Sequence, residues 1–172
     1  MLGPPLRPDV PMLLDLPTLT LVHVILSVVG ILAGLVVVGG LMAGTLFRGW
    51  TGAYLLTTVL TNATGFLFPF RTLLPSHILG GLSLLLLPLA IGALYWKRLA
   101  GRVRPVFVVT AVVALFFNVF VLMVQLFQKF PLLIAVAPTQ QSPAFAATQL
   151  LVLGVFVALG RAAWRGFQPA PA

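Results

Sequence analysis

The stretch that decides the fold is residues 18–45, which read TLTLVHVILSVVGILAGLVVVGGLMAGT and contain no charged side chain. A helix rises about 1.5 Å per residue, so this stretch is longer than the roughly 30 Å of a bilayer's hydrocarbon core. A signal-peptide core is much shorter and follows a basic segment, whereas residues 1–17 are rich in Pro and hold both acids of the chain. Residues 18–45 are therefore expected to form a retained transmembrane helix.

The rest of the chain repeats this design. Hydrophobic residues make up 60% of the sequence and charged residues only 7%, against about a quarter in soluble domains. Long apolar runs separated by short Pro, Gly and Arg segments indicate an all-α integral membrane bundle. We predict one domain over residues 18–164 with five transmembrane helices, at about 18–45, 51–68, 76–96, 105–129 and 144–164. Residues 1–17 form a leader, 130–143 a polar connection and 165–172 a tail.

The basic residues predict the orientation of this bundle, because Lys and Arg concentrate in cytoplasmic loops. Seven fall on one side, against three on the other, and the net charge is +8. The N-terminus is then outside and the C-terminus cytoplasmic, in a bacterial inner membrane. Because the basic residues lie between apolar runs, we interpret them as topology determinants and contacts for anionic lipids, and expect no nucleic acid. The seven are Arg48, Lys97, Arg98, Arg102, Arg104, Arg161 and Arg165, and the three are Arg7, Arg71 and Lys129.

The sequence lacks the residues that several kinds of site require. There is no cysteine, and the only acids are Asp9 and Asp15, both before the first apolar run. Disulfides, thiolate metal sites, carboxylate dyads and carboxylate proton relays inside the membrane are therefore excluded. No nucleophile has both a base and an orienting acid beside it, so no catalytic residue is predicted.

The polar residues inside the apolar runs gather toward the predicted outer end. A polar side chain in a bilayer needs a partner, so such a gathering is where a functional site is sought. The two histidines, His23 and His77, both lie near the outer ends of their helices. The other residues predicted to line a pocket between the first four helices are Thr58, Thr61, Asn62, Arg71, Asn118 and Gln125.

A weak internal repeat relates the two histidines. Thr18-Leu19-xxx-His23 recurs as Thr72-Leu73-xxx-His77, and each copy precedes a basic turn and a helix that carries an Asn. Two parallel helical hairpins followed by a fifth helix would produce this pattern. Glycine pairs on the first span, Gly30-xxx-Gly34 and Gly40-xxx-Gly44, permit close helix packing, either inside the chain or in a homo-oligomer.

Three functions are compatible with these residues. His23 and His77 could ligate a haem b packed by Phe66, Phe68 and Phe120, as imidazole commonly ligates haem iron. The amides and threonines could instead bind a small polar or quinone-like ligand, for electron transfer or for solute transport. The chain could also be a structural subunit of a larger membrane complex. The alternative to a haem site is that one histidine bonds a neighbouring threonine or carbonyl while the other caps the third helix at the lipid headgroups. The alternative to a pocket is that the amides bond helix to helix.

A resemblance covers much of the chain. The residues from Thr58-Val-Leu-Thr-Asn62 through Phe68-Pro-Phe70, with Pro75-Ser-His77 and residues 118–128, resemble those of small polytopic bacterial inner-membrane proteins. That resemblance implies a membrane location and brings no activity with it. The chain is also loosely similar to membrane haem-binding helix bundles in helix count and paired histidines, but it lacks their fuller histidine sets.

Overall fold

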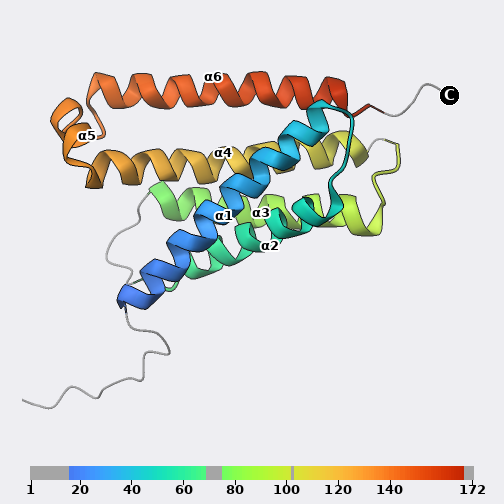
Figure 1. Ribbon diagram of the computed structural model, residues 1–172, viewed down its shortest axis with the longest axis horizontal. Coiled ribbons are helices and arrows are strands. Elements are labelled where there is room, and N and C mark those ends of the chain that lie inside the picture. Colours follow the sequence, from blue (N-terminus) through green and yellow to red (C-terminus); the bar gives the residue numbers. More distant parts are fainter. Residues whose placement is uncertain (1–15, 69–74, 102, 169–172) are drawn as a thin grey trace, which may run out of the picture.

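The structure is a computed structural model that describes residues 16–68, 75–101 and 103–168. These residues form helices and turns, with no strand among them. Figure 1 shows α4 and α6 side by side and α1 crossing them obliquely, with α2 and α3 on the other side of α4 from α6. The elements are α1 (Leu16–Met42), α2 (Arg48–Gly65), α3 (Pro75–Ile91), a π-helical continuation η1 (Gly92–Trp96), α4 (Val103–Lys129), α5 (Pro131–Val136) and α6 (Pro143–Gly166).

Four helices of the described residues are long and apolar enough to cross a membrane, rather than the five expected. They are α1, α3 with η1 from His77 to Trp96, α4 and α6. The second predicted span corresponds to α2, whose composition is too polar to identify it as a membrane-spanning helix. It begins with a charged residue and carries hydroxyl or amide groups along its length, at Thr51, Thr57, Thr58, Thr61, Asn62 and Thr64.

The first helix ends at Met42, three residues before the predicted boundary, because the chain turns at Gly44. Gly44 has a φ of +73°, in the left-handed region that glycine adopts without strain. The amide of Thr45 donates to the carbonyl of Gly40 at 2.8 Å, and that of Gly44 to the carbonyl of Leu41 at 3.1 Å. These two bonds form a Schellman motif, which satisfies the last carbonyls of the helix.

The segment predicted as a polar connection, residues 130–143, contains the short helix α5. Pro131 occupies its first turn, where a missing amide hydrogen costs no helical bond. The connection between α4 and α6 is therefore helical over Pro131–Val136. The remaining turn is closed by the amide of Thr139, which donates to the Ser142 hydroxyl at 3.2 Å, and α6 follows.

The basic residues of the described chain gather at one end of the bundle. The start of α4 and the end of α6 meet there, where Arg104 donates to the carbonyl of Gln168 at 3.1 Å. Gly44, after α1, lies against the Gly166 carbonyl at the end of α6. The turn from η1 to α4 lies at this end as well (Figure 1). The described basic residues of this end are Arg48, Lys97, Arg98, Arg104, Arg161 and Arg165, whereas Lys129 is at the opposite end.

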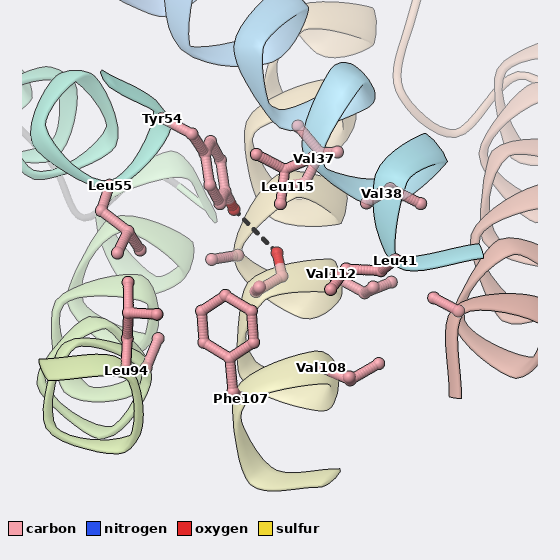
Figure 2. Packing of buried hydrophobic residues seen from close by; sticks show 14 of the residues in the cluster. Val37, Val38, Leu41, Tyr54, Leu55, Leu94, Phe107, Val108, Val112 and Leu115 are labelled. Carbon is pink, nitrogen blue, oxygen red and sulfur yellow. Dashed lines mark hydrogen bonds between the residues drawn. The ribbon is translucent and has the colours of Figure 1, made fainter. Parts of the chain in front are cut away.

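The core forms where α1, α2, α3 and α4 meet. Figure 2 shows Tyr54 of α2 reaching toward α4, close to Val37 of α1 and Leu115 of α4. Tyr54 is only 1% exposed, and Leu115 is completely buried. By contrast, α1 also presents a broad apolar face to the exterior, including Leu21, Ile25 and Leu32, as expected of a helix in contact with lipid.

The glycines of α1 allow this close packing within the chain. A Cβ atom at Gly34 would lie 2.6 Å from Cδ1 of Leu115 and 2.9 Å from Cε2 of Tyr54. A Cβ atom at Gly30 would lie 3.1 Å from the hydroxyl oxygen of Thr57. The Gly30-xxx-Gly34 pair is thus used for contacts with α2 and α4 of the same chain.

Gly34→Ala should therefore destabilise the bundle, by roughly 1–3 kcal/mol for an overpacked core. Gly39→Ala on the same helix is the matched control, because nothing lies within 4 Å of a Cβ atom there. Thermal unfolding in a mild detergent would measure both variants. Equal melting temperatures for Gly34→Ala and Gly39→Ala would contradict this account of the packing.

Candidate functional site

The most polar face of the bundle belongs to α2, and that face is buried. Thr51 and Thr58 are completely buried, while Thr61 and Asn62 are 7% and 8% exposed. The positions share one side of the helix, since residues three, four and seven apart stack along it. The helix contacts both α1 and α3, so its hydroxyls and amides face other helices rather than the exterior.

Hydrogen bonds connect this face to two other helices. The side-chain amide of Asn62 donates to the carbonyl of Thr58 at 2.7 Å and to the Ser83 hydroxyl of α3 at 3.4 Å. The amide of Asn118, on α4, donates to the Thr58 hydroxyl at 3.5 Å. Thr58, Asn62 and Asn118, which the sequence predicted as neighbours, therefore do lie together. The bonds across helices are long, so each is weak by itself.

A shorter bond strengthens the junction between α2 and α4. The Tyr54 hydroxyl donates to the carbonyl of Ala111 at 2.7 Å (Figure 2). Sequence reasoning missed Tyr54 and Ser83. A tyrosine one turn before Thr58 on the same polar stripe, and a lone serine within the apolar run Leu82–Leu87, were the available signals.

Two other predicted pocket residues stand apart from this network, and a third is not described. The Thr61 hydroxyl is buried without a hydrogen-bond partner among the described residues. Gln125 is half-buried on α4 and takes no part in the hydrogen bonds around Thr58 and Asn62. Arg71 lies outside the described residues.

His23 is held against the last turn of α2. Its Nδ1 atom lies 3.0 Å from the Thr64 hydroxyl, and its ring meets that of Phe68 edge-on, with 5.4 Å between centroids. The Thr64 hydroxyl oxygen also lies 2.8 and 3.1 Å from the carbonyl oxygens of Leu60 and Thr61. When the hydroxyl donates to one of these carbonyls, it accepts from Nδ1 of His23, and Nε2 then carries the lone pair.

His77 lies at the same end of the bundle and contacts the same segment. Its ring and that of Phe66 are 6.1 Å apart and inclined by 33°. Each histidine therefore has a different aromatic neighbour just after α2. Phe120, the third aromatic predicted to pack a haem, instead lies 5.9 Å from Phe116, within a cluster that joins α4 to α6.

Two cavities of the described chain lie away from these residues. The larger, of about 720 Å³, is a groove lined on α4 by Val109, Val112, Val113 and Phe116, on α6 by residues between Leu153 and Arg165, and by Gln168 just after α6. The smaller, of about 440 Å³, lies between the end of α4 and the turn around Thr139. Neither is lined by a histidine or by Asn62.

The described residues also hold no cluster of three or more His, Cys, Asp or Glu side chains that could bind a metal ion. The arrangement therefore offers two separate histidines and a hydrogen-bonded polar junction. Comparison with known protein families, with curated proteins and with solved structures finds no match.

Removing the Tyr54 hydroxyl tests the energetic role of the polar junction. Tyr54→Phe should destabilise the protein by about 1 kcal/mol or more, because the buried carbonyl of Ala111 loses its side-chain donor. Tyr95→Phe makes the same chemical change at a residue that is 56% exposed and should be neutral. Unfolding of both variants under identical detergent conditions is the measurement. A neutral Tyr54→Phe would show that the hydroxyl contributes nothing to stability.

Proposed function

We propose that the chain is a small structural subunit of a larger protein complex in a bacterial inner membrane. The observation that carries the proposal is the pairing of Thr58, Asn62, Ser83 and Asn118 with one another. Polar groups that bond across helices hold a bundle together. The residues with most potential for chemistry are thereby used to position α2, and wide apolar faces remain for contact with lipid or with other membrane helices.

In this proposal α2 crosses the bilayer together with the four apolar helices. Its 18 residues span about 27 Å, close to the hydrocarbon thickness. Its polar side chains face α1, α3 and α4, so its low hydropathy does not oppose insertion beside them. The basic end of the bundle faces the cytoplasm by the positive-inside rule, and the histidine end faces outward.

Single-cysteine labelling tests this topology without background, since the natural chain has no cysteine. Gly49→Cys lies at an exposed position in the first turn of α2, Lys97→Cys at an exposed position just after η1, and Gln140→Cys between α5 and α6. A membrane-impermeant maleimide should label Gln140→Cys in intact cells, and the other two only after lysis. Labelling of Gly49→Cys and Lys97→Cys from opposite sides would mean that α2 does not cross.

The proposed role is tested by extracting a tagged full-length chain from its native membrane with a mild detergent. We expect it to migrate as a complex with other integral membrane proteins, well above the 18.4 kDa of the chain. The complex should survive Tyr95→Phe, and the Gly34→Ala change should weaken it by loosening the bundle. A particle that contains only this chain, as a monomer or a homo-oligomer, would overturn the subunit proposal.

A second function is favoured by the geometry of His23. In the tautomer in which Nδ1 donates to the Thr64 hydroxyl, Nε2 would be the atom that ligates a haem iron, and a hydrogen bond to the other nitrogen is usual for ligating histidines. His77, against Phe66 at the same end, would be the second ligand. Bound haem would let the subunit transfer electrons. A reduced-minus-oxidised difference spectrum with haem bands, lost in both His23→Ala and His77→Ala, would establish this function in place of the structural one.

A further inference from the structure

The groove between α4 and α6 has two chemically different halves. One half is apolar, with Phe116, Leu153 and Phe156 on its walls. The other half carries Arg161 and Arg165, one helical turn apart on α6, together with Trp164 and Gln168. The whole groove has a volume of about 720 Å³, which is within the range usual for small-molecule sites.

The dimensions of the groove match one leaflet of a bilayer. Leu153 and Arg161 are eight residues apart, or about 12 Å along α6. One leaflet contributes about half of the 30 Å hydrocarbon core. Gly160 also lines the groove, and a Cβ atom there would lie 3.4 Å from Cγ1 of Val112, so α4 and α6 approach each other closely at this point.

The charges at the basic half have no counterpart in the described protein. Asp9 and Asp15, the only acids of the sequence, both precede the described residues. Arg104 nearby is engaged, since it donates to the carbonyl oxygens of Leu99 and Gln168, and its guanidinium lies 4.8 Å above the Phe167 ring. Arg161 and Arg165 line the groove with no carboxylate to pair with in the described chain. An anion from outside the protein is the complementary partner.

We propose that this groove binds one anionic phospholipid from the leaflet at the basic end of the bundle. An acyl chain lies along Val112, Phe116 and Leu153, and the phosphate is bound by Arg161 and Arg165. Guanidinium groups match phosphate oxygens in geometry as well as in charge, and tryptophan is enriched at the depth of lipid headgroups, where Trp164 is expected. The proposal requires that the bundle lie in a bilayer, but it does not depend on which proteins the chain contacts.

Native mass spectrometry of the full-length chain in detergent tests the headgroup contacts. Phosphatidylglycerol should be retained as a one-to-one adduct, at least tenfold more than phosphatidylcholine with the same acyl chains. The double variant Arg161→Gln/Arg165→Gln should lose that preference. Arg48→Gln/Lys97→Gln removes the same charge from the same end, outside the groove, and should keep it. Equal retention of the two lipids, or equal loss in both double variants, would overturn the proposal.

A second pair of variants tests the apolar half. Val157→Trp should fill the groove and reduce phosphatidylglycerol binding about tenfold, whereas Leu151→Trp, at an exposed position of α6 outside the groove, should not. Inorganic phosphate added to the lipid-bound chain should not displace the adduct. Displacement by phosphate would show that the site binds an anion rather than a lipid, and would overturn the proposal. A dimer that Val157→Trp disrupts in the absence of lipid would show instead that a second copy of the chain covers the groove.

Discussion

The bundle depends on one constraint, which is that the buried hydroxyl and amide groups of α2 need partners where no water is available. Tyr54 and Asn62 are almost completely buried, and both donate hydrogen bonds, to Ala111 and to Thr58 and Ser83. An unpaired polar group in such surroundings is costly, so α2 is stable beside α3 and α4 and much less so against lipid. Each bond across helices contributes modestly, about 0.6 kcal/mol on average in a membrane bundle. Together they orient the helix.

This constraint explains which parts of the fold the sequence could predict. The apolar helices follow from the length and composition of their runs, and those at 76–96, 105–129 and 144–164 were predicted to within a few residues. That α2 is a helix was equally clear, but its composition alone does not support a membrane span. Its polar side chains lower its mean hydropathy, and many of them are covered only because other helices pack against them. The remaining differences between the predicted and the observed helices come from local backbone geometry. Gly44 ends α1 early, and Pro131 begins a helix where polar flanks indicated a loop.

The candidate site was predictable in its members and less so in its chemistry. Spacing along a helix places Thr58 and Asn62 on one face, and the chain direction places Asn118 near them. The sequence pattern does not reveal whether these polar groups enclose a pocket or bond to one another, because that depends on the distance between the helices. Gly80 decides it here, because its missing side chain lets α3 approach to where a Cβ atom would lie 3.3 Å from Oδ1 of Asn62. Ser83, one turn along the same helix, then reaches the amide directly.

The same reasoning separates α6 from the other helices. Only 17% of its most apolar 18-residue window is buried in the chain, against 39% for α4. It packs closely at the basic end, at Ala163 and at Gly166, which lies against the main-chain carbonyl of Met42. At its other end Phe145 is buried against Phe127, with 5.5 Å between the ring centroids. Between these two ends the ring of Phe156 meets that of Phe116, and the groove lies beside this contact. The groove continues toward the basic end of the bundle, where Arg161 and Arg165 line it. Small residues that permit close packing and a concentration of positive charge occur at the same end of the bundle, so the groove combines apolar walls with two arginines.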